Sequence, residues 1–254
     1  MSVEASYPDL RGKAALVSGG ADGIGRATVT MLARQGVRTG FIDIARDAGE
    51  ALAAALMAEG LDVAFEHADL RDVDAARDAA EMLKTRLGPV SMLVNNAGHD
   101  ERHSFASITP AYWDDRFAVN LRPMMVLAQA VAPGMAALGG GSIINLGSTS
   151  WMKGATDLIA YATAKSAVLG FTRSLARELG PDGVRVNCVT PGWVMTRRQR
   201  SEHMSAERWA KAQAQQAIKG AIEPEDVAAM ILFLCSGASR MCTGQNFIVD
   251  AGTV

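Results

Sequence analysis

Two side chains that can move or hold a proton, Tyr161 and Lys165, stand four residues apart in the segment 161–165, YATAK. The segment is typical of a helix, and residues at i and i+4 share one helix face. A lysine charge favours the phenolate of a neighbouring tyrosine, whose unperturbed pKa of about 10 makes it a weak base at neutral pH. Tyr161 is therefore a candidate general base. The alternative is a core tyrosine beside a solvated lysine.

Two further polar residues precede this pair. Ser148 follows the apolar run 141–147, GSIINLG, so its hydroxyl is expected where a strand passes into a loop. Binding and catalytic groups gather in such loops. Asn120 falls in the middle of a helical region expected over Pro110–Leu138, where asparagine is a mediocre helix former. Its alternative role is that of a surface or structural asparagine.

A glycine-rich turn must position a cofactor near these residues. The apolar run 14–18, AALVS, leads into 19–25, GGADGIG, and then into a helical pattern over Arg26–Gln35. Strand, glycine turn and helix in this order let the backbone approach a pyrophosphate at the helix N-terminus. Glycines also serve plain turns, so the surrounding pattern has to support this interpretation.

Two acids follow the next two predicted strands. Asp43 ends the strand 38–43, 18 residues beyond Gly25, where a carboxylate accepts hydrogen bonds from an adenosine ribose. This favours NAD, because a 2′-phosphate would be repelled there. Arg46 leaves weaker use of NADP as the alternative. Asp69 follows the strand 62–67 and is a candidate adenine contact. For both acids the alternative is a helix N-cap.

Strands and helices alternate along the whole chain. Further strands are predicted at 91–94, 183–189 and 246–249, and helices at 47–59, 73–87 and 225–235. This spacing predicts an α/β fold: one Rossmann-type, doubly wound parallel sheet with helices on both faces. Ligands bind at the carboxyl ends of such strands. We expect a single domain over 1–254, in which 193–220 is a lid over the substrate; a surface helical hairpin is the alternative for 193–220.

Composition excludes several classes of protein. The net charge of −2 offers no basic field for nucleic acid or an anionic membrane. The longest apolar run, 227–235, is far shorter than a membrane span, and residues 1–10 lack the regions of a signal peptide. Three cysteines without a CxxC pair suit a reducing compartment and give no metal-ligand spacing. The sequence predicts a cytoplasmic protein without a metal.

Together these motifs resemble the short-chain dehydrogenase/reductase family over 10–254. Residues 18–25 look like its cofactor loop, with serine in place of the usual threonine, and 95–98, NNAG, matches its sheet-stabilising motif. Asn120, Ser148, Tyr161 and Lys165 match its catalytic tetrad in order and spacing. The resemblance implies that Tyr161 is the base, that Ser148 holds the reacting oxygen, and that Lys165 binds the nicotinamide ribose and lowers the Tyr161 pKa. Asn120 would hold a water linking Lys165 to solvent.

The expected cofactor contacts come from the glycine turn, the strand ends and a segment that resembles the family's nicotinamide site. Besides Tyr161 and Lys165 they are Gly19, Asp22, Gly23, Ile24, Gly25, Asp43, Ile44, Asp69, Leu70, Asn96, Ala97, Gly98, Pro191, Gly192, Val194 and Thr196.

Narrower stretches, including 95–103, 111–114, 129–135, 150–151 and 250–252, look like bacterial aldose 1-dehydrogenases of this family, which oxidise D-xylose, L-arabinose, L-fucose or L-rhamnose. The expected reaction is hydride transfer from the anomeric carbon of a small aldose to NAD, giving a lactone. Polar and aromatic groups after the strands suit a sugar; they are His99, Asp100, Ser148, Trp151, Tyr161 and Trp193. For Trp151 the alternative is core packing, for His99 a backbone contact, and for Asp100 solvation.

Other functions stay open at this point. A reductase of 3-oxoacyl groups or other ketones would share the tetrad, and a non-catalytic dinucleotide sensor would tolerate loss of Tyr161 or Lys165. Long helical regions that are apolar on more than one face, 110–138 and 155–179, and the family resemblance together predict a homotetramer.

Overall fold

A computed structural model describes residues 5–254, so that residues 1–4 of the stretch considered for a signal peptide lie outside it. Seven strands form one sheet: β1 (Ala14–Ser18), β2 (Arg38–Asp43), β3 (Val63–His67), β4 (Met92–Asn95), β5 (Gly141–Leu146), β6 (Val184–Pro191) and β7 (Asn246–Val249). Their order is β3-β2-β1-β4-β5-β6-β7, and every pair is parallel. The expected doubly wound parallel sheet is confirmed.

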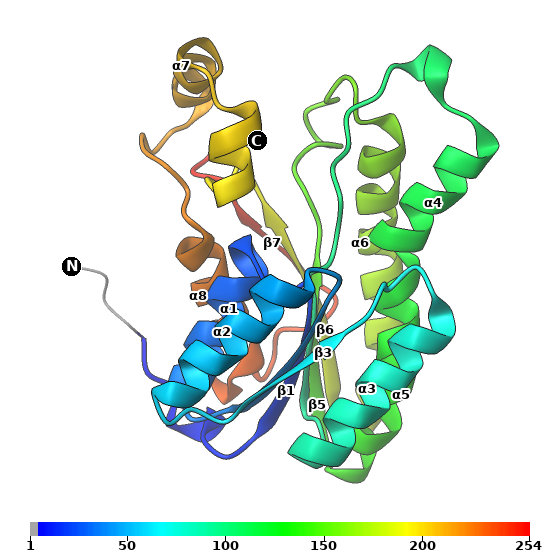
Figure 1. Cartoon of the computed structure of the whole chain (residues 1–254), viewed down its shortest axis with the longest axis vertical. Helices are drawn as coiled ribbons and strands as arrows, with labels where there is room; N and C mark the ends of the chain where they lie inside the picture. Colours follow the sequence, from blue (N-terminus) through cyan, green and yellow to red (C-terminus); the bar gives the residue numbers. More distant parts are fainter. Residues whose placement is uncertain (1–4) are drawn as a thin grey trace.

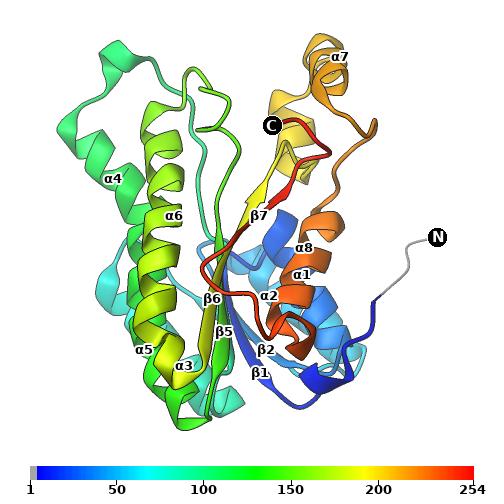
Figure 2. The same cartoon turned by 180° about the vertical axis from the view of Figure 1, so that it is seen from behind.

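Eight α-helices accompany the sheet: α1 (Gly23–Arg34), α2 (Arg46–Ala58), α3 (Val73–Leu87), α4 (Pro110–Asn120), α5 (Arg122–Ala137), α6 (Ile159–Leu179), α7 (Ala206–Gln215) and α8 (Pro224–Cys235). Helices α1, α2 and α8 cover one face of the sheet, and α3, α5 and α6 cover the other (Figures 1 and 2). Each parallel crossover must pass over a face of the sheet, so two apolar cores form. Leu32, Leu52 and Ile231 lie in the first core, and Leu83, Leu127 and Val186 in the second.

The structure corrects one predicted helix. The region 110–138 is two helices rather than one, because Leu121 (φ −134°, ψ −51°) leaves the helical conformation between α4 and α5. Asn120 is thus the last residue of α4, and it is fully buried rather than on the surface. The poor helix propensity of asparagine matches its place at a helix end better than a place at the middle.

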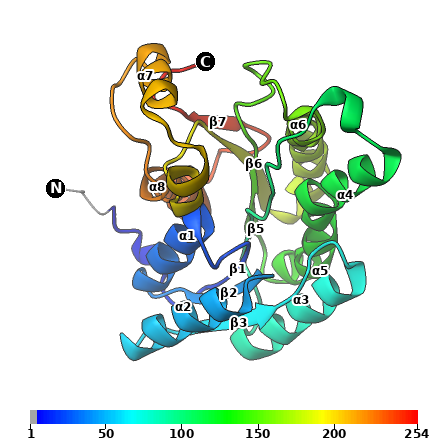
Figure 3. The same cartoon turned by 45° about the horizontal axis from the view of Figure 1, so that its top comes forward.

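The direction in which successive strands are added to the sheet reverses at the boundary between β1 and β4. The chain builds β1, β2 and β3 outward on one side and then returns to place β4 on the other side of β1. Side chains and turns at the carboxyl ends of these strands meet at that switch point. In Figure 3 this end of the sheet comes forward, with α7 on one side of it and α4 on the other. Within 5–254, no helix has the length and apolar character of a membrane span.

Candidate active site

A cavity of about 860 Å³ lies at the carboxyl ends of the strands. We call the part lined by the glycine turn, Asp43 and Asp69 the turn half, and the part lined by His99, Asp100, Trp193 and α7 the loop half. Of the sequence-predicted site residues the cavity brings together Gly19, Asp22, Gly23, Ile24, Asp43, Ile44, Asp69, Leu70, Asn96, Ala97, Gly98, His99, Asp100, Ser148, Tyr161, Lys165, Pro191, Gly192, Trp193, Val194 and Thr196. Gly25, Asn120 and Trp151 do not line it.

The glycine turn is built by close backbone approach. Gly19 has φ +67° and Gly23 has φ +55°, both in the left-handed region that favours glycine. A Cβ on Gly25 would lie 1.8 Å from the Gly19 carbonyl oxygen, so Gly25 acts by permitting the turn rather than by lining the cavity. The Asn96 amide donates to the Gly19 carbonyl at 2.8 Å and ties the turn to β4.

The hydroxyl of Ser18 makes hydrogen bonds of the kind expected from the threonine that usually occupies this position. It accepts hydrogen bonds from the backbone N–H groups of Asn96, at 3.0 Å, and Ala97, at 3.2 Å. One strand further along, the Asn95 amide donates to Asn145 at 2.8 Å. The asparagine motif therefore connects strands, as expected.

Neither Asp43, the predicted ribose contact, nor Asp69, the predicted adenine contact, is a helix N-cap. Asp43 accepts from the backbone N–H groups of Ala21 and Ala45, both at 2.9 Å, and helix α2 has Ala45 as its N-cap without a side-chain cap. Asp69 pairs with Arg71, whose hydrogen bonds hold the Asp69 pKa below its usual value. The N-cap of α3 is Asp72.

These features fit a dinucleotide. The glycines bring the turn close to the N-terminus of α1, whose N–H groups can bind a pyrophosphate, and the Asp43 carboxylate, fixed by two N–H groups, retains lone pairs for ribose hydroxyls. Among the described residues, no group of three or more His, Cys, Asp or Glu side chains is arranged to hold a metal ion.

The predicted acid–base pair lies at the junction of the two halves. The Lys165 ammonium is 5.8 Å from the centroid of the Tyr161 ring and donates to the Leu146 carbonyl at 2.8 Å. Burial raises the pKa of Tyr161 to about 12; the Asp100 charge acts in the same direction, and a hydrogen bond with Ser148 opposes it. Burial lowers the pKa of Lys165 to about 8. Both groups are desolvated, and the Tyr161 pKa is therefore raised rather than lowered by the Lys165 charge as the sequence predicted, so the phenol is protonated at neutral pH.

Asn120 connects α4 to the loop after β4. Its Oδ1 accepts from the His99 backbone N–H at 2.8 Å, and its Nδ2 donates to the His99 carbonyl at 3.2 Å and to the Arg116 carbonyl at 2.9 Å. A Cβ on Gly98 would come within 3.0 Å of Asn120 Oδ1 and 3.3 Å of Lys165 Nζ. Asn120 therefore lies directly behind the part of the cavity wall that Gly98 and Lys165 form.

Four polar side chains, Asp100, Trp193, Arg198 and Gln199, form a hydrogen-bonded cluster in the loop half, which we call the clasp. Asp100 accepts from Arg198 at 2.8 Å and from Gln199 at 3.0 Å, and the Trp193 indole N–H donates to Gln199 at 2.8 Å. The segment predicted as a lid contains a π-helical turn, Gln199–His203, followed by α7. Asp100 is therefore held by protein partners rather than solvated.

Sequence reasoning missed several residues and misplaced one. Arg116, Arg198 and Gln199 contact predicted site residues but were not singled out; Arg116 could have been found, because it stands one helical turn before Asn120. Trp151 was expected at the substrate but does not line the cavity, and its buried Nε1 has no hydrogen-bond partner. The loop after β5 presents Ser148, Thr149 and Ser150 to the cavity instead.

An open parallel sheet, a glycine turn at its switch point, and a tyrosine and lysine at the end of the same cavity define a Rossmann-type, dinucleotide-dependent oxidoreductase. Known proteins resolve the class further. A family model described as Enoyl-(Acyl carrier protein) reductase matches residues 19–254. The chain is 46% identical to D-xylose 1-dehydrogenase of Caulobacter vibrioides, with 98% of each chain covered. It is 42% identical to "Probable galactose dehydrogenase" of Rhizobium meliloti, over 97% of this chain and 96% of that protein.

A solved structure matches the fold over almost the whole chain. It is 7α-hydroxysteroid dehydrogenase complexed with NADH and 7-oxo glycochenodeoxycholic acid, with a TM-score of 0.92, 29% identity and 97% of each chain covered. The chain belongs to the short-chain dehydrogenase/reductase family. It is therefore an oxidoreductase that uses a nicotinamide dinucleotide and a small-molecule substrate.

Proposed function

We propose that this protein oxidises a small aldose at its anomeric carbon with NAD and releases a lactone. The main observation behind this proposal is the polar character of the loop half. His99, Asp100 and Trp193 line the cavity there, beside Tyr161 and Ser148. A site built to bond hydroxyl groups disfavours apolar substrates, because its polar groups would be left unpaired. The near full-length similarity to D-xylose 1-dehydrogenase supports the same substrate class.

The proposed chemistry assigns one role to each tetrad residue. Tyr161, in its phenolate form, takes the proton of the anomeric hydroxyl, and Ser148 holds the same oxygen by a hydrogen bond. The bound dinucleotide supplies the acceptor for the hydride. Lys165, mostly protonated at neutral pH with a pKa of about 8, binds the nicotinamide ribose and favours the Tyr161 phenolate. Asn120 fixes the wall behind Lys165 through His99 and carries the proposed water link to solvent.

NAD rather than NADP is the proposed cofactor. The carboxylate of Asp43, at the end of β2, would repel the 2′-phosphate of a cofactor whose ribose it contacts. Arg46, the residue that could offset this repulsion, is engaged by His67 at 2.9 Å and by Glu50 at 3.6 Å. Limited NADP use remains the weaker alternative.

The proposal extends to the whole molecule. Residues 193–220 would act as the substrate lid of a single catalytic domain, since Arg198, Gln199 and α7 line the loop half. The protein would be a cytoplasmic homotetramer; exposed apolar side chains at Met125 and Ile159 support helix pairing, and free cysteines suit a reducing compartment. A monodisperse monomer by light scattering at micromolar concentration would contradict the tetramer.

A substrate panel tests the reaction. NADH formation from NAD is followed with D-xylose, L-arabinose, D-galactose, L-fucose and L-rhamnose and with aliphatic secondary alcohols, and NADH consumption is followed with an acetoacetyl thioester. We expect turnover with at least one aldose. Activity confined to the alcohols or the thioester would replace the sugar assignment with the second candidate, a secondary alcohol dehydrogenase or a reductase of 3-oxoacyl or other ketones. No turnover at all, with NAD bound, would favour a dinucleotide sensor.

A further inference from the structure

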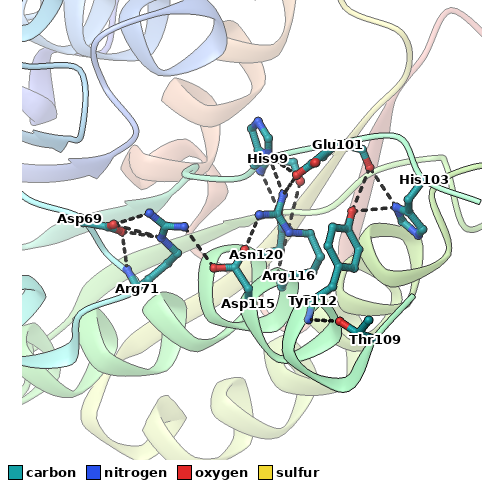
Figure 4. Close-up of polar contacts among 10 residues, drawn as sticks. All are labelled: Asp69, Arg71, His99, Glu101, His103, Thr109, Tyr112, Asp115, Arg116 and Asn120. Atoms are coloured by element: carbon teal, nitrogen blue, oxygen red, sulfur yellow. Dashed lines mark hydrogen bonds and ion pairs between the residues drawn. The ribbon is translucent and has the colours of Figure 1, made fainter. Parts of the chain in front are cut away.

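Arg116 contacts the imidazole of His99 at the wall of the loop half (Figure 4). Its Nη1 lies 2.6 Å from His99 Nδ1. A guanidinium can only donate hydrogen bonds, so Nδ1 has to accept, and the ring proton of a neutral histidine must then be on Nε2. The contact therefore selects one tautomer of His99.

Arg116 itself is held firmly. Its side chain is 8% exposed, Nη1 lies 3.0 Å from Glu101 Oε2, and Nη2 pairs with Asp115. The guanidinium carbon lies 5.2 Å from the centroid of the Tyr112 ring, within the range of a cation–π contact. Figure 4 shows these partners surrounding Arg116 on α4, with a chain of pairs continuing from Asp115 to Arg71 and Asp69. Because two carboxylates hold the buried guanidinium of Arg116, it can contact His99 in only one orientation.

His99 is open on its other side. Its side chain is 44% exposed and lines the cavity, while Asn120 fixes its backbone on both the N–H and the carbonyl. In Figure 4 one edge of the ring faces Arg116 and the other points away from it. The Nε2–H group is therefore the edge left for a ligand.

The charges around His99 favour the neutral ring. Burial lowers the pKa of His99, and the positive charges of Arg198 and Arg116 add to this effect. The carboxylates of Glu101 and Asp100 act in the opposite direction but do not reverse it.

We propose that Arg116 is a positioning residue that presents His99 Nε2–H as a hydrogen-bond donor to one oxygen of the substrate. The assignment of that oxygen to a sugar rests on the proposed function, whereas the tautomer does not. A substrate with a hydroxyl or ring oxygen at this point pairs with the donor. An analogue that lacks the oxygen leaves a desolvated N–H without a partner and binds less well.

Long-range ¹H–¹⁵N NMR of the imidazole rings tests the geometry without turnover. The chain has four histidines, so His99→Gln identifies the His99 signals by their loss. At pH 7.5 we expect a neutral ring protonated on Nε2, and a mixture of both tautomers in Arg116→Met. Arg77→Met, which removes an exposed arginine of α3, is the matched control. An Nδ1–H tautomer or an imidazolium in the unaltered protein overturns the proposal even where Arg116→Met does not fold.

Kinetics with the sugar that the panel identifies tests the role. Arg116→Met and His99→Leu should each raise KM roughly 3- to 10-fold, the loss of one hydrogen bond, with a smaller change in kcat. His99→Gln, which keeps a side-chain N–H, should retain part of the affinity, and NAD affinity measured by fluorescence should be unchanged in all three. Unchanged KM in both Arg116→Met and His99→Leu would refute the role. Failure of every sugar would refute the proposed function and leave the NMR result to judge Arg116.

Discussion

The two halves of the cavity are held together by different means. In the turn half, backbone approaches backbone: the Asn96 amide bonds the Gly19 carbonyl, and a Cβ at Gly25 would collide with that same carbonyl. In the loop half, long side chains meet across about 100 positions of sequence, as Asp100 does with Arg198 and Gln199. The first arrangement tolerates few residue types, while the second can be rebuilt with other polar groups. Under the proposed function, cofactor binding therefore depends on the more constrained half, and substrate choice on the half that other side chains could rebuild.

Tyr161 lies at the junction of the two halves, so its replacement should separate the effect on turnover from the effect on NAD binding most clearly. Tyr161→Phe should keep the fold and NAD binding, because the turn half is untouched, and should lower kcat on the order of 100- to 10,000-fold through loss of the general base. Stopped-flow kinetics and NAD titration measure the two effects separately. Turnover like that of the unaltered protein would remove Tyr161 from the mechanism.

Lys165 offers a test of the same junction that needs no substrate. Its pKa of about 8 in the folded state lies below the model-peptide value of 10.5, so the unfolded chain binds more protons between these limits. Stability should therefore rise by about 3 kcal/mol in total as pH increases from about 8 to about 10.5, and this contribution should be constant below the folded pKa. Above pH 10 the raised pKa of Tyr161 acts in the opposite direction.

Thermal unfolding of the unaltered protein and of Lys165→Met across pH 7.5–10 measures this contribution as a difference. The variant should lack the rise. Lys13→Met, which removes an exposed lysine paired with Asp9, is the matched control and should keep it. Parallel curves for Lys165→Met and the unaltered protein would contradict a desolvated Lys165.

Within the turn half, Asp43→Ala should weaken NAD binding roughly 10- to 100-fold and narrow the preference over NADP, since hydrogen bonds to a charged acceptor are lost. The ratio of kcat/KM for the two cofactors is the measurement. Asp47→Ala, an exposed acid in the first turn of α2, should change neither value. Higher efficiency with NADP in the unaltered protein would make the cofactor assignment wrong.

The smallest effect is expected from the clasp of the loop half. Asp100→Asn removes the charge that meets Arg198, a partly exposed pair, and should raise the KM for substrate by up to about fivefold. Hydrogen exchange of the backbone in 196–215 should become faster, because the segment loses an anchor. Asp114→Asn, an exposed acid of α4, is the control. Unchanged exchange in Asp100→Asn would show that the clasp does not hold the lid.

The same contrast explains how far the sequence could be interpreted. The turn half was predictable because glycines, an acid after β2 and an NNAG segment are local signals with local causes, and the strands Ala14–Ser18, Arg38–Asp43 and Asn246–Val249 were predicted with their observed bounds. The loop half depends on contacts between distant side chains, which no local pattern encodes. Trp151 shows the limit: its neighbour Ser148 was placed correctly, but the direction of the indole depends on packing.

The break at Leu121 separates a helix that packs on the sheet from a helix that carries residues of the site. Helix α5 packs against α3, β4 and β5, whereas α4 packs against α6 and against α5 itself, and carries both Arg116 and Asn120. A substitution that shifts α4 can therefore reshape the loop half without repacking the sheet beneath it.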